Sequence, residues 1–399
     1  MTLSEPESVL TLFVKEVSGS TFLASLMPTL RYFGWLAPQF LVAGHLERFR
    51  RFVPVTLAFE AFRFVSYLLI AATVAVFGLT RPALTIAVFF GLFAITRVAA
   101  GSSAVARTEL VARMVPPQDR AIVVSARRLS GGVAGFLAGL LVRSVLSERV
   151  LAWPYSYALL IGISGLAFGL AMASLIGIVE PNVPIKPRSL SIRDQLRRAP
   201  QLLKSDKRYR LYTLLRGTST GLTVAAPFYI LFATEVLGVA PAMAGVYISV
   251  RTLMRVLSNA YWGRQCRTRS SVWVLSMANL FGLVAPATVL LLSLASSPGP
   301  IHRWVFGAVF AVQGLIGSAQ GIGQTACLYE IAPERDRLTY FGLANTIVGP
   351  LYFLPAIGGA VVERMGYMPI FAVSAAMLAI GFLITLRLSW LCRQPERAV

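Results

Sequence analysis

Long stretches without a charged residue constrain the fold of this 399-residue chain more than any other feature. A helix needs about 20 consecutive apolar residues to cross the hydrocarbon core of a bilayer. Five stretches reach this length with no charge: 155–179, 272–294, 304–328, 340–362 and 366–386. Six more reach it with one or two embedded charges: 22–43, 55–79, 84–104, 129–147, 211–233 and 243–262. A membrane β-barrel would show shorter alternating segments. The pattern predicts an all-α polytopic membrane protein with eleven complete spans.

The distribution of charge places this chain across a membrane and excludes other classes. Only 14% of the residues are charged, against roughly 25% in soluble domains, so a soluble protein is excluded. The net charge is +20, but the basic residues fall between apolar runs and form no nucleic-acid-binding patch, so no nucleic-acid partner is expected. One alternating set of loops holds 23 of the 37 basic residues and the opposite set holds five, which places the first set in the cytoplasm. Arginine far outnumbers lysine, a bias that suits a bacterial genome, so we expect the chain to lie in a bacterial cytoplasmic membrane. Membrane lipid is an expected partner, and the chain is expected to be a monomer.

The sequence shows no cluster of residues typical of a metal site, a disulfide framework or a catalytic centre. The two histidines are far apart and the three cysteines have no paired spacing, so neither a metal site nor a disulfide framework is expected. Without a nucleophile–base pair the chain is not expected to be an enzyme, and no cofactor is expected. No Gly-x-x-x-x-Gly-Lys-Ser/Thr loop occurs, so ATP is not expected to drive its activity.

An internal repeat divides the chain into two halves. Lys15–Gly19 matches Thr234–Gly238 at an offset of 219, and Val115–Arg120 matches Ala332–Arg337 at an offset of 217. Two six-helix halves joined by a linker are a known transporter architecture. We therefore predict pseudo-symmetric halves at 1–179 and 211–399, joined by a basic cytoplasmic linker at 180–210.

The repeat also predicts an incomplete first span. Subtracting the offset from Leu211, where the seventh span begins, places the start of the first span about eight residues before Met1. Only its second half, Val9–Val14, is recognisable, and the two glutamates within 1–7 do not suit a continuation of the helix. We expect a reading frame shortened at its start and a working protein of twelve spans.

Several arginines lie at membrane depth, where each costs about 2.5–3.5 kcal/mol on insertion scales. Arg31 lies near the middle of the second span, Arg97 just past the middle of the fourth, and Arg251 within the eighth. Such residues need a water-filled cavity, a functional role or a structural partner. Glu60 and Glu109 are the nearest candidate partners in the sequence.

A polar stripe marks the tenth span. Gln313 and Gln320 are two helical turns apart, and Gln324 follows one turn later, so the three share one face. Such a stripe suggests hydrogen bonds to a substrate, and bonds between neighbouring helices are the alternative. Weaker candidates for a substrate cavity share a polar side chain in an apolar span: Tyr229, Asn345 and Tyr352.

Three signatures resemble the major facilitator superfamily. After the second span that family has a Gly-x-Leu-x-Asp-Arg-x-Gly-Arg-type loop, and this chain has Ala43–Arg51, with Glu47 in place of the aspartate and Arg50 in place of the second glycine. In the fourth span, Arg97 and Gly101 match the family's Arg-x-x-x-Gly pattern. A Pro-x-x-Asp-Arg loop follows both the fourth and the tenth spans.

The resemblance implies both a fold and a set of roles. It implies two six-helix halves around a cavity bordered by the spans that carry Arg31, Arg97, Arg251 and the glutamine stripe. It implies a cytoplasmic gate in which acidic and basic side chains pair; topological anchoring of the arginines is the alternative. The residues given this role are Glu47, Arg48, Arg51, Asp119, Arg120, Asp336 and Arg337.

The functional expectation is secondary active transport of a small organic solute by alternating access. Arg97 matches the family arginine linked to antiport, which favours export coupled to a proton or other ion gradient. The arginines at membrane depth favour the alternative, import or exchange of an organic anion. A second class of function, a non-transporting sensor or lipid-handling protein on the same scaffold, also remains.

Overall fold

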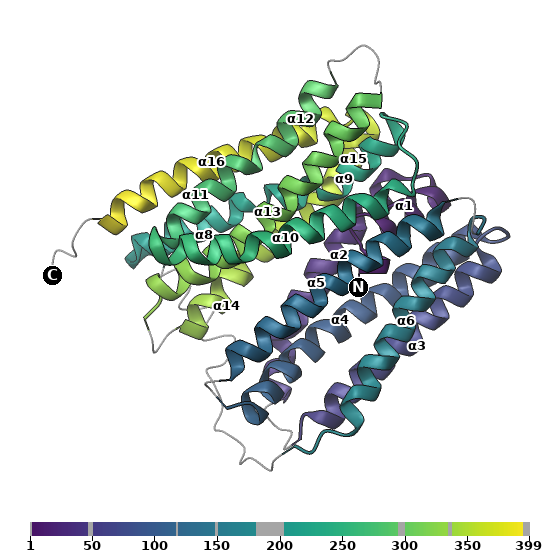
Figure 1. The fold of residues 1–399 in the computed structure, drawn as a ribbon, viewed down its shortest axis with the longest axis horizontal. Helices are drawn as coiled ribbons and strands as arrows, with labels where there is room; N and C mark the ends of the chain where they lie inside the picture. Colours follow the sequence, from purple (N-terminus) through teal and green to yellow (C-terminus); the bar gives the residue numbers. More distant parts are fainter. Residues whose placement is uncertain are drawn as a thin grey trace. The chain divides into compact units, whose positions relative to one another are not determined.

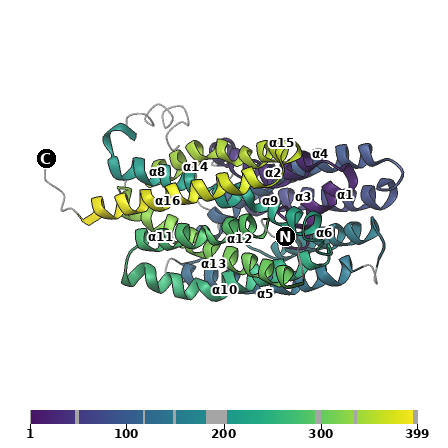
Figure 2. The same cartoon turned by 90° about the horizontal axis from the view of Figure 1, so that it is seen from above.

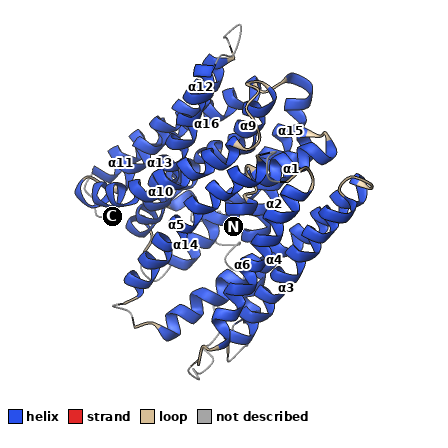
Figure 3. Ribbon diagram, turned by 45° about the vertical axis from the view of Figure 1, so that its right-hand side comes forward, coloured by secondary structure: helices blue, strands red, loops and turns tan. Residues whose placement is uncertain are grey.

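The computed structural model describes residues 2–46, 51–116, 119–147, 151–180, 203–293, 300–333 and 337–393. Every regular element in these ranges is a helix (Figure 3). The described chain forms two compact units, Met1–Ser189 with Ala240–Val246 and Leu190–Val239 with Tyr247–Val399. Most of the predicted basic linker, 181–202, lies outside the described residues.

The described part of the first unit contains six α-helices after a short 3₁₀ turn (Figure 1). Their bounds are η1 (Thr2–Ser4), α1 (Val9–Ser18), α2 (Thr21–Leu46), α3 (Val53–Phe77), α4 (Pro82–Met114), α5 (Arg120–Leu146) and α6 (Tyr155–Ile176). Helix α3 packs against α4 and α6, and α2 packs against α4 and α1. The η1 turn packs against α5 and α6, so the segment before α1 is folded into the unit.

The second unit contains both long helices and interrupted ones. Their bounds are α8 (Lys207–Ser219), α9 (Gly221–Glu235), α10 (Met243–Thr268), α11 (Ser271–Gly282), α12 (Val284–Leu292), α13 (Pro300–Ile331), α14 (Arg337–Val348), η2 (Gly349–Phe353), α15 (Leu354–Met365) and α16 (Met368–Arg393). Helix α16 packs against α8, α9, α11 and α12, as Figure 2 shows for this long yellow helix.

Prolines account for two of the interruptions. Pro286 lies in the first turn of α12, where its missing N–H removes the bond that would continue α11. Pro350 is the second residue of the 3₁₀ stretch η2, and Pro355 is the second residue of α15. The helices of these spans are therefore interrupted at positions that the sequence marks with proline.

The predicted apolar stretches are confirmed as helices. Each of the eleven apolar stretches coincides with a helix or with closely spaced helices in succession, as 211–233 does with α8 and α9. Eight of the described helices are long and apolar enough to cross a membrane. Many of their large apolar side chains face outward; Leu170 is 74% exposed and Val76 is 63% exposed, as suits contact with lipid.

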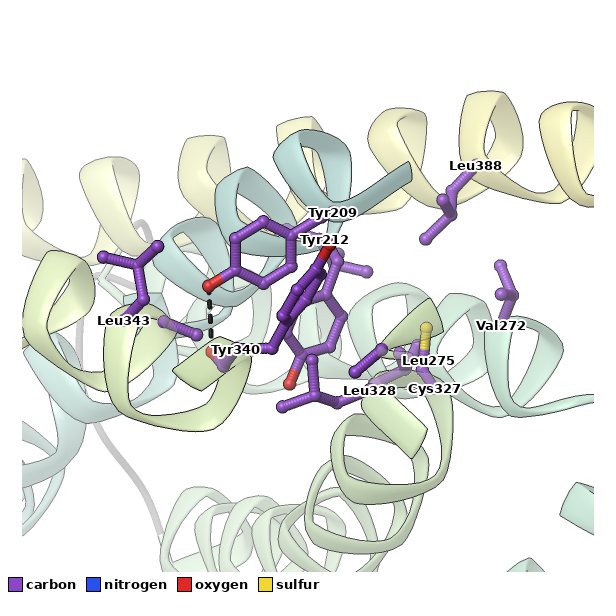
Figure 4. Packing of buried hydrophobic residues seen from close by; sticks show 12 residues of the cluster. Tyr209, Tyr212, Val272, Leu275, Cys327, Leu328, Tyr340, Leu343 and Leu388 are labelled. Atoms are coloured by element: carbon purple, nitrogen blue, oxygen red, sulfur yellow. Dashed lines mark hydrogen bonds between the residues drawn. The ribbon is translucent and has the colours of Figure 1, made fainter. Parts of the chain in front are cut away.

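The cytoplasmic end of the second unit is held by an aromatic core (Figure 4). Tyr209 on α8 lies 4.4 Å from the ring of Tyr340 on α14, centroid to centroid, and its hydroxyl donates to the Tyr340 carbonyl at 2.8 Å. Asp206 caps α8 by accepting from the Tyr209 N–H at 2.9 Å, and its other oxygen accepts from the Tyr340 hydroxyl at 3.2 Å. These bonds place the start of α14 against α8.

The internal repeat is visible in matching local structure within each unit. Gly19 ends α1 with φ +69° and Gly238 follows α9 with φ +62°, a left-handed conformation that favours glycine. Glu16 accepts a hydrogen bond from the Tyr157 hydroxyl at 2.8 Å, and Glu235 accepts one from the Tyr367 hydroxyl at 2.5 Å. In both units, a glutamate in the last turn of one helix thus meets a tyrosine at the start of another.

Candidate functional site

Arg97 is the most deeply buried arginine among the predicted cavity residues. It lies on α4 and is only 3% exposed. One nitrogen donates to the Tyr67 hydroxyl on α3 at 2.8 Å, and the guanidinium carbon lies 4.8 Å from the centre of the Phe93 ring. Its Nε–H is buried with no acceptor, and no carboxylate among the described residues forms an ion pair with it. Arg97 thus keeps donor capacity for a further polar group.

A glycine lets Arg97 occupy this position. A Cβ atom on Gly34 of α2 would lie 2.6 Å from the Arg97 Cβ, well inside van der Waals contact. Gly34 therefore allows α2 to approach α4 at the level of the arginine. Any larger residue at 34 would push the two helices apart.

Arg31 is paired with two carboxylates, Glu5 and Glu7, that were not among its predicted partners. On α2, its Nη1 forms an ion pair with Glu5 and lies 3.2 Å from the Glu7 carboxylate. The neighbouring Tyr32 hydroxyl donates to Glu7 at 2.7 Å. Glu5 and Glu7 are 8% and 9% exposed, while the Arg31 side chain is 31% exposed. The segment before α1 therefore supplies the countercharge to α2.

Unpartnered hydroxyl groups accompany this ion pair. The hydroxyls of Ser4, Ser8 and Thr29 are buried and have no hydrogen-bond partner. Ser4 and Ser8 flank the two glutamates in sequence, and Thr29 precedes Arg31 by two residues on α2. Arg97 also lies near enough to Arg31 for their charges to interact. Buried polar groups normally have hydrogen-bond partners. The three unpartnered hydroxyl groups beside the Arg31 ion pair are therefore suited to binding a polar ligand or a proton.

The expected partners of the buried arginines are corrected by the structure. Glu60 binds Arg63, one turn away on the same helix, with oxygens at 2.8 and 3.0 Å. It also accepts from the Ser103 hydroxyl at 2.6 Å and lies 3.4 Å from Arg107. Glu109 instead pairs with Arg113 at 3.1 Å, one turn away on α4. The prediction that Glu60 or Glu109 partners Arg31 or Arg97 is wrong, because nearer cations on α3 and α4 occupy both carboxylates.

Glu180 organises the cytoplasmic end of the first unit. Its carboxylate accepts from the backbone N–H groups of Phe52 and Val53 at 2.6 and 3.0 Å, where α3 begins. Arg113 lies 3.3 Å from the other oxygen and stacks over the Phe52 ring at 4.4 Å. A negative charge at a helix N-terminus is favourable. Glu180 was not among the predicted site residues, and its signal in the sequence is an acidic side chain directly after the sixth apolar run.

The predicted cytoplasmic gate residues are only partly described. Arg51 is exposed just before α3, and Asp119 is exposed at the start of α5 without a side-chain capping bond. Gly101 is buried in α4. Glu47, Arg48 and Asp336 lie outside the described residues, as do the side chains of Arg120 and Arg337. The gate roles therefore stay predictions.

In the second unit the predicted stripe lies on α13. The side-chain nitrogens of Gln313 and Gln320 are buried without a hydrogen-bond partner. Between them, Gly314 approaches the backbone of Arg251 on α10 so closely that a Cβ would lie 2.2 Å from its carbonyl oxygen. The two glutamines thus leave donors unused beside a tight contact between α10 and α13.

The remaining cavity candidates have mixed surroundings. Tyr229 is fully buried, its hydroxyl has no partner, and its ring lies 5.0 Å from that of Phe371. The side-chain oxygen of Asn345 on α14 accepts a hydrogen bond from the Arg216 guanidinium on α8 at 2.5 Å. Tyr352 is half-buried in η2, and the Gln324 backbone carbonyl accepts from the Tyr212 hydroxyl at 3.1 Å. Of these residues, Tyr229 alone combines full burial with an unused polar atom.

Comparison with known proteins assigns the fold. No protein-family model matches the chain. The multidrug resistance protein MdtG of Serratia proteamaculans (strain 568) is 26% identical over 181 residues, which cover 42% of this chain and 40% of that protein. The chain thus matches less than half the length of this curated relative.

Solved transporter structures match over nearly the full length. A mutant of the nucleoside transporter NupG has a TM-score of 0.70 at 13% identity over 97% of this chain and 96% of that one. A D-xylose-proton symporter has a TM-score of 0.72 at 12% identity over 97% and 94%. The chain therefore has the fold of these transporters. The predicted resemblance, the all-α multi-pass fold and the membrane location are confirmed, and both solved structures are named as transport proteins.

Proposed function

We propose that this chain is a member of the major facilitator superfamily, a secondary active transporter that exports a small organic solute in exchange for protons. The supporting observation is Arg97, a buried cation with an unused Nε–H and no carboxylate partner among the described residues. A buried charge without a countercharge is costly unless it serves a ligand or a moving proton. The name of the relative MdtG, a multidrug resistance protein, supports export.

Glu5 and Glu7 are the proposed proton-accepting groups. In the state described, both carboxylates face Arg31, and Tyr32 donates to Glu7. A proton on either carboxylate removes one negative charge and weakens the ion pair. Because the glutamates precede α1 while Arg31 lies on α2, protonation loosens the contact between these two elements. Such a change couples proton binding to the movement of helices in alternating access.

Import or exchange of an organic anion is the second candidate. It is favoured by the same Arg97, whose free donor capacity and positive charge suit a carboxylate or phosphate on the substrate. If the substrate is an anion, Glu5 and Glu7 neutralise the charge of Arg31, and Arg97 alone binds the substrate. The two candidates differ in the charge of the transported solute and in their response to the proton gradient.

Flux in inside-out membrane vesicles tests the proposal. A panel of radiolabelled organic cations and anions is presented with and without an uncoupler. Uncoupler-sensitive uptake into these vesicles is expected for at least one solute. Uptake of an anion that persists without a proton gradient supports the second candidate. An absence of specific flux for every solute contradicts both and favours a sensor.

The combined variant Glu5→Gln with Glu7→Gln is expected to lower gradient-driven uptake at least about tenfold, a change of about 1.4 kcal/mol in coupling. Exchange of labelled for unlabelled solute without a gradient is expected to persist, because the amides keep the shape of the site. Glu109→Gln is the matched control, since its side chain is 41% exposed and pairs only at the helix surface. Wild-type uptake by the double variant contradicts the assignment of these glutamates.

A further inference from the structure

A large pocket lies in the first unit, away from the Arg31 and Arg97 region. Its volume is about 860 Å³, within the roughly 300–1,000 Å³ typical of small-molecule sites. The end of α1, the end of α5, the start of α6 and Ala240–Ala242 form its walls. These segments belong to the loops with few basic residues, so the pocket opens on the extracytoplasmic side.

The walls combine one carboxylate with aromatic and apolar groups. Among the described lining residues Glu16 is the only charged one, and its carboxylate accepts from the Tyr157 hydroxyl. Leu146, Leu151 and Pro241 supply apolar surface. Trp153 adds an indole ring, and aromatic faces attract cations. A positively charged ligand with a large apolar body matches this set of groups.

The electrostatics of Glu16 also suit a cationic ligand. The residue lies in the last turn of α1, beyond the apolar stretch Val9–Val14. Desolvation by the surrounding protein raises the pKa of its carboxyl group, and the hydrogen bond from Tyr157 partly opposes this shift. The neighbouring Lys15 points its ammonium group to the Thr21 hydroxyl at 2.6 Å. Desolvation destabilises the charged form of the carboxyl group, and a bound cation would stabilise it.

The repeat provides an internal comparison. In the second unit Glu235 and Tyr367 form the equivalent hydrogen bond, but the nearby pocket has a volume of only about 230 Å³. That pocket is lined by apolar residues, Ser293 and Tyr367, and Glu235 is not among its lining residues. The shared Glu–Tyr bond is therefore a property of the fold, whereas the pocket beside it is large and carries the glutamate in its wall in the first unit, and is small and lacks the glutamate in the second.

We propose that this pocket is a binding site for lipophilic organic monocations, anchored by Glu16 and Trp153. It is separate from the Arg31 and Arg97 region and does not depend on the proposed direction or coupling of transport. The apolar body of the ligand packs on Leu146 and Leu151, and its positive charge lies beside the Glu16 carboxylate. The Glu16–Tyr157 bond holds the carboxylate in place.

Binding of tritiated tetraphenylphosphonium to the full-length protein in lipid nanodiscs tests this site. Glu16→Gln is expected to raise the dissociation constant of the Glu16-dependent binding at least about tenfold, as for loss of a desolvated charge contact. Trp153→Leu is expected to raise it about threefold, the size of a cation–π contact at a partly open site. Neutral triphenylphosphine oxide is expected to bind wild type and Glu16→Gln alike.

The matched control is Glu235→Gln, which removes the repeat-equivalent carboxylate and is expected to leave the affinity within about twofold of wild type. Arg97→Ala is also expected to retain the Glu16-dependent binding, which separates this site from the transport site. Equal affinity in wild type and Glu16→Gln overturns the proposal, and so does an equal loss in Glu235→Gln.

A pH titration of the unmodified protein gives a second test that needs no variant. Because the pKa of Glu16 is raised, its negative charge is lost as the pH falls towards that value, at a higher pH than for an ordinary glutamate near 4.3. Binding of the monocation is therefore expected to be strong near neutral pH and to weaken on acidification. The Tyr157 hydroxyl faces the Glu16 carboxylate, and the neighbouring Lys15 directs its ammonium group to Thr21. Binding that does not change with pH overturns the proposal.

Discussion

Replacing Arg97 with alanine is expected to reduce gradient-driven uptake into inside-out vesicles by about 100-fold or more. Hydrogen bonds to a charged group contribute about 1.5–3 kcal/mol each, and about 2.8 kcal/mol corresponds to a factor of 100. The alanine variant removes the bond to Tyr67, the stacking on Phe93 and the unused Nε–H together. It leaves no cation in this part of α4.

Arg97→Lys distinguishes a specific guanidinium from a simple positive charge. Lysine keeps the charge, but its ammonium group lacks both the planar fork and the Nε–H. We expect this variant to recover less than about a tenth of the wild-type uptake, although its lower side-chain volume suits the tight space beside Gly34. Arg81→Ala is the control, because Arg81 is exposed and directly precedes the same helix. Wild-type uptake by Arg97→Lys assigns Arg97 a charge role only, and wild-type uptake by Arg97→Ala contradicts its role in transport.

The apolar runs predicted the helices well because hydrophobic length is a local property of the sequence. The stretch 155–179 predicted α6 (Tyr155–Ile176), and 272–294 predicted the pair α11 and α12. Bilayer thickness and backbone hydrogen bonding require such segments to be helical whatever their neighbours are. The repeat offset likewise located Glu16 and Glu235 at equivalent helix ends.

The partners of the buried charges could not be predicted in the same way. The acidic segment 1–7 looked like a poor continuation of a helix, and the structure instead places Glu5 and Glu7 against Arg31. Glu60 looked available to a distant arginine, but Arg63 lies one turn away on the same helix. These pairings depend on how helices pack, and packing depends on contacts such as Gly34 against Arg97 that no periodicity reveals.

Glu60→Gln is expected to destabilise the protein by about 3–5 kcal/mol, the usual cost of breaking a buried ion pair by removing one partner. Glu60 is 1% exposed and Arg63 is 3% exposed, so the remaining guanidinium keeps its charge without water to solvate it. The same carboxylate also accepts from Ser103 on α4. Unfolding of the purified protein in mixed micelles, by increasing concentrations of a denaturing detergent, measures the change.

Glu109→Gln is the matched comparison for Glu60→Gln on the same scale. Its pair with Arg113 is exposed on the glutamate side, so a loss below about 1 kcal/mol is expected. Equal losses in the two variants contradict the view that burial makes the Glu60 pair different.

Replacing both partners shows what the buried pair is for. Glu60→Leu with Arg63→Met leaves no unpaired buried charge, since the side chain of Arg107, the other cation near Glu60, is 40% exposed. Such replacements are often neutral or stabilising. We therefore expect the double variant to recover most of the stability that Glu60→Gln loses. Arg63 also stacks on Phe168 of α6, with its guanidinium carbon 3.9 Å from the ring centre, and Glu60 reaches Ser103 on α4. A stable double variant with impaired uptake would mean that the pair sets the position of α3 between α4 and α6, and through Tyr67 the position of Arg97.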